Sequence, residues 1–222
     1  MMLRTLAFAA TLVASTAAIN NTIFVISNAE QPSLFRPGLT PVGVQRATEC
    51  LPQLFADKDI GKIISCPKNE ESAVCFETLA TAQPIADALG LPIDTSCGAD
   101  ENTDDDCVTG LTKKFAKNST QNILIVWDFF GVGALLEQNL DLDTDPADAV
   151  DGIHYDVVVE VVRSKIRLVT SQNCTNLDGE APSTARRSLS PAQRRERSLK
   201  RREAKKSRRN SKMARSMELP PF

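Results

Sequence analysis

The chain contains a single histidine, His154, and this limits the acid–base chemistry that its sequence can support. A Ser-His-Asp hydrolase would have to use this histidine, but the sequence lacks the Gly-x-Ser-x-Gly elbow of such enzymes, and His154 opens an expected strand beside Gly152. We interpret His154 as a structural or surface residue. The residue types alone therefore identify no catalytic group.

An Asp-x-Asp-x-Asp run from Asp141 to Asp145 begins like a calcium-binding loop. Pro146 stands where that loop requires its turn glycine, and Gly152 stands where it requires a bidentate glutamate. The pattern favours a solvated acidic loop. We therefore expect no metal site here and no cofactor.

The N-terminal segment has the pattern of a secretory signal peptide. Met1 to Arg4 carry a positive charge, Leu6 to Val13 are apolar, and residues 15–18 are small side chains that a signal peptidase accepts. The apolar stretch is too short to span a bilayer, and no later stretch is long enough. We predict that residues 1–18 are removed, that the protein is secreted and extracellular, and that it has no transmembrane segment.

Six cysteines behind a signal peptide favour disulfides over metal thiolates, because the secretory pathway is oxidising. About 15 pairings are open to six cysteines, and only Cys97 with Cys107, which flank the acidic loop Asp100 to Asp106, is suggested by its local spacing. Three N-x-Ser/Thr sequons fit the same compartment, and we expect glycosylation of at least Asn118 or Asn173. The disulfide candidates are Cys50, Cys66, Cys75, Cys97, Cys107 and Cys174, and the sequons begin at Asn20, Asn118 and Asn173.

Short β-branched runs alternate with longer helical patterns between residues 22 and 170, which is typical of an α/β fold with parallel strands. Thr40 before Pro41 predicts a helix start. The last two runs, separated only by Ser164 and Lys165, predict a hairpin at one edge of the sheet. The expected strands are 22–27, 62–65, 122–127, 155–163 and 166–170, and the expected helices are 41–55, 71–89, 108–117 and 132–140.

Four stretches follow one another in an informative order. A strand over 22–26 runs into Ser27-Asn28-Ala29-Glu30, then come Leu39-Thr40-Pro41-Val42-Gly43 with Ala47, then Ser65-Cys66-Pro67 with residues 83–92, and then a strand ending at Trp127-Asp128 before Ala134-Leu135-Leu136. Together they resemble the histidine phosphatase (phosphoglycerate mutase-like) superfamily, which has R-H-G-E, L-T-P-x-G, S-S-P and S-H-G-G at these places. The resemblance implies a three-layer α/β/α sandwich with a mostly parallel sheet.

The same resemblance implies that the chemistry of the family is missing. Its members form a phosphohistidine on one histidine and hold the phosphoryl oxygens with a second histidine and with arginines. Here Ser27, Asn28 and Asp128 occupy the matching positions, and the helix arginine falls on Val74 or Phe76. Asn28 cannot replace the nucleophile, because its nitrogen lone pair is delocalised into the carbonyl.

These residues predict a pseudo-phosphatase, a non-catalytic binding or interaction protein for an unknown protein or small-molecule ligand. Its degenerate active-site positions are Ser27, Asn28, Glu30 and Asp128. One alternative is an active phosphomonoesterase or mutase with a diverged site, which the single histidine argues against. Another is a hard cation held by oxygen atoms of Glu30, Asp128 and Asn28.

The charge of the chain is divided unevenly. Fourteen of the 26 Lys and Arg residues lie between Arg186 and Arg215, whereas only three of the 28 Asp and Glu residues follow residue 185, so an acidic body precedes a basic tail. We predict an α/β domain over 19–178 and a disordered tail over 179–222. Polyanion contact through Arg186 to Arg215, cleavage at its four Arg-Arg pairs and a mispredicted gene end are open alternatives for the tail.

Overall fold

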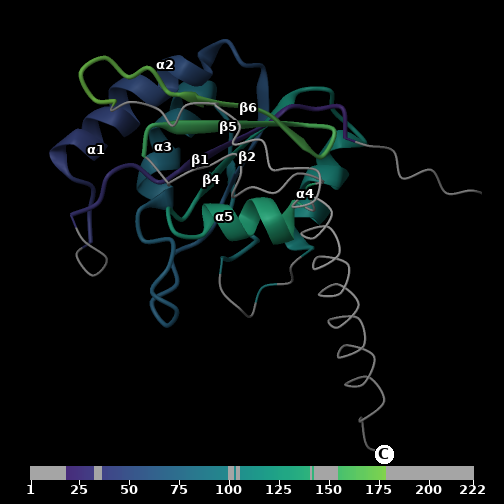
Figure 1. Ribbon diagram of the computed structural model, residues 1–222, viewed down its shortest axis with the longest axis horizontal. Coiled ribbons are helices and arrows are strands. Elements are labelled where there is room, and N and C mark those ends of the chain that lie inside the picture. The colour runs from purple at the N-terminus through teal and green to yellow at the C-terminus, as the bar shows by residue number, and fades with distance from the viewer. Residues whose placement is uncertain are drawn as a thin grey trace, which may run out of the picture. The chain divides into compact units, whose positions relative to one another are not determined.

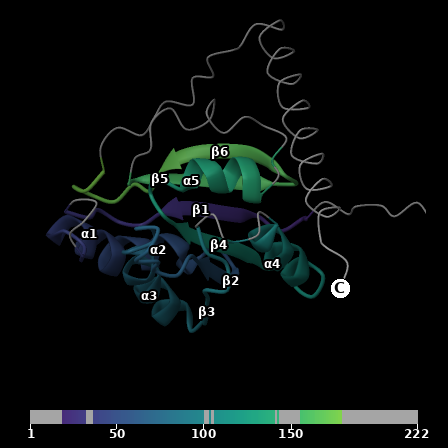
Figure 2. The same ribbon diagram turned by 90° about the horizontal axis from the view of Figure 1, so that it is seen from below.

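A computed structural model of the chain describes residues 19–32, 37–99, 103, 106–140, 142 and 155–178. Its centre is a six-stranded sheet with the strand order β3-β2-β4-β1-β5-β6, which Figure 2 shows from β6 at the top to β3 at the bottom. The strands are β1 Ile23–Ser27, β2 Ile60–Ser65, β3 Ile93–Asp94, β4 Asn122–Trp127, β5 Val157–Val162 and β6 Lys165–Ser171. Strands β3, β2, β4 and β1 pair in parallel, and β5 and β6 are antiparallel. The predicted mostly parallel α/β sheet is confirmed.

The helices cover both faces of this sheet. One helical segment consists of α1 Pro41–Gln45, a π-helical turn η1 Arg46–Cys50, and α2 Leu51–Ala56; the others are α3 Thr78–Leu89, α4 Cys107–Ala116, α5 Val132–Ala134 and the π-helical turn η2 Leu135–Asn139. Thr40 caps α1 by accepting the Gly43 N–H, and Pro41 takes the first helical position, as its sequence predicts. No helix of the described residues is long and apolar enough to cross a membrane.

Alternate side chains of the strands build two hydrophobic cores. On one face, Val25 and Ile125 pack with Leu135 and the helices α4 and α5; on the other, Ile26 and Leu124 pack with α2 and α3. Figure 1 shows α2 and α5 on opposite sides of the strands. Strand β1 is buried along its whole length, as expected for a strand covered on both faces. The layers are therefore α/β/α.

Most predicted elements begin and end within two residues of their predicted limits, and two departures have a clear structural cause. The helix expected from residue 71 begins only at Thr78, because the Cys66–Cys75 disulfide closes a loop in which Asn69 and Val74 form a β-bridge. The hairpin between β5 and β6 turns at Arg163 and Ser164, one residue earlier than expected. Both residues have positive φ angles of 51° and 59°, as a two-residue type I′ turn requires.

All six cysteines are paired. The Cys97–Cys107 disulfide agrees with the local pairing suggested by the sequence, and Cys66–Cys75 spans a similarly short loop. Cys50–Cys174 instead joins residues 124 positions apart, and it ties the segment after β6 to the end of η1. This long-range disulfide closes most of the described chain into one loop.

Candidate functional site

The motif positions meet at the carboxyl edge of the sheet. Strands β1 and β4 are parallel, with Ser27 opposite Trp127, and the Asn28 N–H donates to the Trp127 carbonyl at 2.9 Å. Asn28 and Asp128 therefore follow the ends of two neighbouring strands. Open α/β sheets bind their ligands at such an edge.

Asn28 is buried, and its amide is used by the backbone around it. Its Oδ1 accepts the Phe129 N–H at 2.8 Å, and its Nδ2 donates to the Ala29 carbonyl at 3.0 Å. The neighbouring Ser27 is also buried, and its hydroxyl donates to the Asn28 carbonyl. Asn28 thus holds the loops after β1 and β4 together, whereas Ser27 bonds only within its own segment.

Asp128 is buried, and both of its carboxylate oxygens accept backbone hydrogen bonds. The Cys75 N–H donates to Oδ2 at 2.9 Å, and the Phe130 N–H donates to Oδ1 at 3.0 Å. The first bond joins the end of β4 to the loop that the Cys66–Cys75 disulfide closes. Asp128 therefore stabilises the two loops that surround it.

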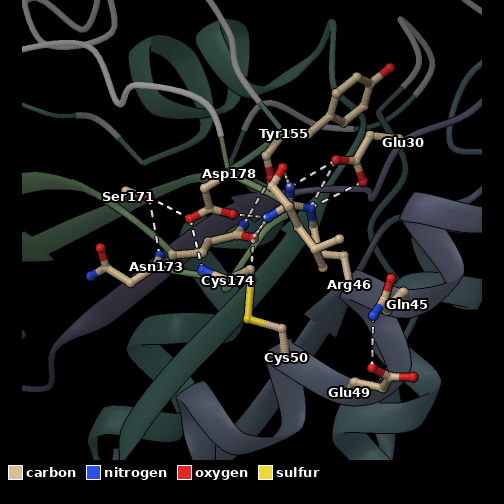
Figure 3. Close-up of a disulfide and its surroundings, with 12 residues drawn as sticks. Glu30, Gln45, Arg46, Glu49, Cys50, Tyr155, Ser171, Asn173, Cys174 and Asp178 are labelled. Atoms are coloured by element: carbon tan, nitrogen blue, oxygen red, sulfur yellow. Dashed lines mark hydrogen bonds and ion pairs between the residues drawn. A yellow bond between two sulfur atoms is a disulfide. The ribbon is translucent and has the colours of Figure 1, made fainter.

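Glu30 lies in a cluster centred on Arg46, which Figure 3 shows beside the Cys50–Cys174 disulfide. The guanidinium of Arg46 pairs with Glu30 at 2.8 Å and with Asp178 at 2.6 Å. It also donates to the Gln172 side chain and to the Leu177 carbonyl. Burial lowers the pKa of Arg46, but hydrogen bonds and charges from the two carboxylates outweigh it, so the pKa lies above its ordinary value and the group stays charged.

Arg46 is the residue that sequence reasoning missed. It is 1% exposed and lies in the helix that follows the L-T-P-x-G stretch, where a surface arginine would be the ordinary expectation. Its partners Gln172 and Asp178 are 126 and 132 positions away, so no local pattern connects them. Glu30 therefore belongs to a cluster in which one cation, Arg46, is shared by two carboxylates, Glu30 and Asp178.

Among the described residues, Arg46 is the one guanidinium at the carboxyl edge of the sheet. The other described arginines are Arg163 and Arg167. Arg163 lies in the β5–β6 hairpin near the amino end of β1, and Arg167 pairs with Glu160 on β5. In the loop of Val74, where the family arginine was sought, Lys68 pairs with Glu70 and lies over the Phe76 ring. Among the described residues, the cations near Asn28 and Asp128 are therefore already paired with carboxylates.

Two buried polar atoms lack hydrogen-bond partners in the part of the chain that the structure describes, Ser65 Oγ and Asp156 Oδ2. Ser65 ends β2, and Asp156 precedes β5, which begins at the carboxyl end of β1. Both therefore belong to the same edge as Asn28 and Asp128.

Three aromatic residues lie beside these positions. Phe129 stacks on Tyr155 with ring centroids 4.2 Å apart, and Phe130 meets Phe129 edge-on at 5.1 Å. Burial raises the pKa of Tyr155, the charges of Glu30 and Asp128 raise it further, and a backbone hydrogen bond from Gln31 opposes them. The charges of Glu30 and Asp128 therefore both favour the protonated hydroxyl of Tyr155.

The sequons lie at two edges of the sheet. Asn20 and Asn118 are exposed near the amino ends of β1 and β4, where the Asn21 side chain donates to the Ser119 carbonyl and so joins the two sequons. Asn173 is exposed just after β6, at the carboxyl edge. His154 and the acidic run Asp141 to Asp145 lie outside the described residues, apart from Leu142.

The geometry offers no group of three or more His, Cys, Asp or Glu side chains that could hold a metal ion among the described residues. Glu30, Asp128 and Asn28, the set considered for a hard cation, are bound instead to Arg46 and to backbone N–H groups. In this structure the oxygen atoms of this set therefore accept hydrogen bonds from groups of the protein itself.

No protein-family model matches the chain, and no curated protein sequence matches it. Among solved structures, it is similar to the protein histidine phosphatase SixA complexed with tungstate, with 15% identity, a TM-score of 0.47, and coverage of 68% of this chain and 97% of that one. It is similar to a phosphoserine phosphatase of Entamoeba histolytica in complex with 3-phosphoglyceric acid, with 17% identity, a TM-score of 0.48, and coverage of 71% and 98%. A SixA protein of Agrobacterium tumefaciens has 18% identity, a TM-score of 0.46, and coverage of 68% and 97%. These likenesses concern the fold, and we take no residue role from them.

Proposed function

We propose that this protein is a secreted, non-catalytic binding protein that has the histidine phosphatase fold without its chemistry. The hydrogen bonding of Asn28 and Asp128 carries the proposal. Their oxygen atoms accept the N–H groups of Phe129, Phe130 and Cys75, so both side chains serve the loops around them. A site for phosphoryl transfer would instead direct such groups at its substrate.

Nucleophilic attack on phosphorus requires an available lone pair. The amide nitrogen of Asn28 has none and is engaged with the Ala29 carbonyl. His154, the only histidine, lies outside both motif positions. The proposal therefore includes the absence of a phosphohistidine intermediate.

Charge at the site also opposes phosphate binding. Two unit charges about 4 Å apart interact by roughly 4 kcal/mol at an effective dielectric constant of 20, so an ionised Asp128 repels a phosphate by about that energy. Its carboxylate also takes two backbone N–H groups that an oxyanion would need as donors. Asp128 thus competes with a bound phosphate both in charge and in hydrogen bonding.

Secretion is supported by the signal-like N-terminal segment and by the pairing of all six cysteines. Mass spectrometry of protein recovered from culture medium tests it. We expect a mature N-terminus near residue 19, three disulfides, and a glycan on Asn118 or Asn173. Intracellular protein with unmodified asparagines and free thiols would refute secretion.

Enzyme assays test the non-catalytic proposal. We expect the purified chain to release no phosphate from p-nitrophenyl phosphate, phosphoserine or 3-phosphoglycerate above a blank. The Asn28→His variant should remain inactive, because the arginines and the second histidine of such a site act together with the nucleophile. Turnover by the unmodified protein that is lost on substitution of Asn28, Asp128 or His154 would overturn the proposal.

A further inference from the structure

The residues that replace the two histidines hold an aromatic surface in place. The aromatic patch consists of Phe129, Phe130 and Tyr155. Asn28 accepts the Phe129 N–H, and Asp128 accepts the Phe130 N–H, so the turn that carries both phenylalanines is anchored by the degenerate positions themselves. Phe130 remains 59% exposed, which is more than any other large hydrophobic side chain of the described residues.

Two carboxylates of the described residues lie close to the patch, and Asp128 Oδ1 accepts the Phe130 N–H at 3.0 Å. Glu30 and Asp128 both act electrostatically on Tyr155. Arg46, the cation beside Glu30, is buried and is shared with Asp178, so its cluster has one carboxylate in excess. Among the described residues, the patch therefore offers aromatic faces beside carboxylates.

Aromatic faces next to carboxylates suit a guanidinium group. The negative face of an aromatic ring attracts cations, and arginine is favoured over lysine because its planar, weakly hydrated head stacks on the ring. The exposure of Phe130 favours a protein segment over a small molecule, since small ligands are held in enclosed pockets. Arginine and aromatic residues are also the side chains that contribute most at protein interfaces.

We infer that the aromatic patch binds an arginine-bearing peptide segment of a partner protein, with a guanidinium stacked on Phe130 and directed toward the carboxylates of the edge. This inference rests on the proposed function, because it names the partner chemistry of the same site. The negative charge of the chain before the basic tail does not by itself imply this binding, because the proposed contact requires the ring of Phe130.

Fluorescence polarisation with the full chain tests the inference. The probes are labelled peptides of alternating glycine with arginine, lysine or glutamate. We expect the arginine peptide to bind, the lysine peptide to bind at least about threefold more weakly, and the glutamate peptide not to bind. Phe130→Ala and Phe130→Leu should each weaken arginine-peptide binding by about threefold to tenfold, because both remove the aromatic face.

Leu168→Ala is the matched control, since Leu168 is an exposed apolar residue on β6, away from the patch. It should leave the affinity unchanged. Arginine-peptide binding that survives Phe130→Leu at full strength would refute the inference, as would equal affinity for the lysine peptide. Phe130-dependent self-association in sedimentation, or Phe130-dependent binding to phosphatidylcholine vesicles, would assign the patch to another occupant and also refute it.

The two proposals fail separately. A chain that is inactive on phosphate esters but shows no Phe130-dependent binding would refute the arginine inference and leave the non-catalytic proposal standing. Phosphatase turnover would refute the non-catalytic proposal, whatever the peptides do.

Discussion

Two side chains at neighbouring strand ends decide what the carboxyl edge of this sheet can do. A histidine at either place could take a proton or attack phosphorus, whereas the Asn28 amide and the Asp128 carboxylate form hydrogen bonds to nearby backbone. These bonds lock the loops after β1 and β4 to each other and to the Cys66–Cys75 loop. At the scale of residues, Asn28 and Asp128 therefore stabilise the loops around them.

The Asp128→Asn variant should be less stable. Asparagine keeps one acceptor oxygen and puts a donor against either the Cys75 or the Phe130 N–H, so one buried N–H loses its partner. We expect the free energy of unfolding to fall by about 1–3 kcal/mol in urea denaturation. Asp57→Asn, at an exposed position, should change it by less than about 0.5 kcal/mol. Equal or greater stability of Asp128→Asn would indicate that Asp128 is kept for a ligand rather than for the fold.

Arg46 should matter more than any exposed ion pair. Arg46→Met leaves Glu30 and Asp178 without their cation in a buried cluster, and such losses cost about 3–5 kcal/mol. Arg167→Met removes a pair whose arginine is 68% exposed and should cost less than about 1 kcal/mol. Chemical denaturation of the two variants gives the comparison, and similar losses for both would contradict the role given to Arg46.

The sequence could place Asn28 and Asp128 but not their hydrogen bonds. Both residues end β-branched runs, and parallel strands bring their carboxyl ends together, so the two positions were predictable as neighbours in a parallel sheet. The donors Cys75 and Phe130 depend on loop conformations that no periodicity encodes. Arg46 was unpredictable for a related reason, because its partners come from the far end of the domain.

At the scale of elements, the sequence predicted a helix correctly where neighbouring residues determine its start. Thr40 and Pro41 started the first helix as expected, and its continuation through Ala56 follows the predicted range. The start of α3 was misplaced, because a disulfide overrides the helical pattern of residues 71–77. The two-residue strand β3 was too short to give any pattern.

An ion pair between Lys62 and Asp94 joins β2 to β3, beside the backbone pairing of the two strands. Burial raises the pKa of Asp94. Hydrogen bonds from Lys62 and Ser96 together lower it by more than burial raises it, so the pKa lies below the ordinary 3.8. A carboxyl whose pKa is lower in the folded state stabilises the fold above its unfolded pKa, and this contribution is lost as the pH falls through the folded pKa.

Asp94→Asn should therefore lower the free energy of unfolding at pH 7, by less than about 1 kcal/mol because both side chains are partly exposed. The difference from the unmodified protein should shrink as the pH falls below about 3.8. Urea denaturation at pH 7 and pH 3 measures it. A difference that is the same at both pH values would show that the ionised carboxylate of Asp94 does not stabilise β3.

At the scale of the whole molecule, we expect the segment that follows β6 to complete the domain. This segment, residues 172–178, is called the strap. It carries Gln172 and Asp178, which bind Arg46, and Cys174, which is joined to Cys50. We propose that residues 19–178 form the folded unit and that residues 179–222 add little to its stability, since the basic tail offers few apolar side chains.

Two truncations test this limit. A chain ending at Asp178 should lose less than about 5 °C in Tm, because it keeps every contact of the strap. A chain ending at Ser171, with Cys50→Ser to remove the free thiol, loses a disulfide between residues 124 positions apart and should lose about 4–5 kcal/mol of stability. Calorimetry of both chains decides the matter, and equal Tm values would place the domain boundary before the strap.

The central claim, which follows from the proposed function, is that the carboxyl edge of the sheet does not hold an oxyanion. Isothermal titration calorimetry of the full chain with orthophosphate, followed by tungstate, tests it directly. The account predicts no saturable heat at millimolar concentrations of either anion, because Asp128 repels them and its backbone donors are occupied. Saturable binding that disappears when Asn28 or Asp128 is substituted would contradict it.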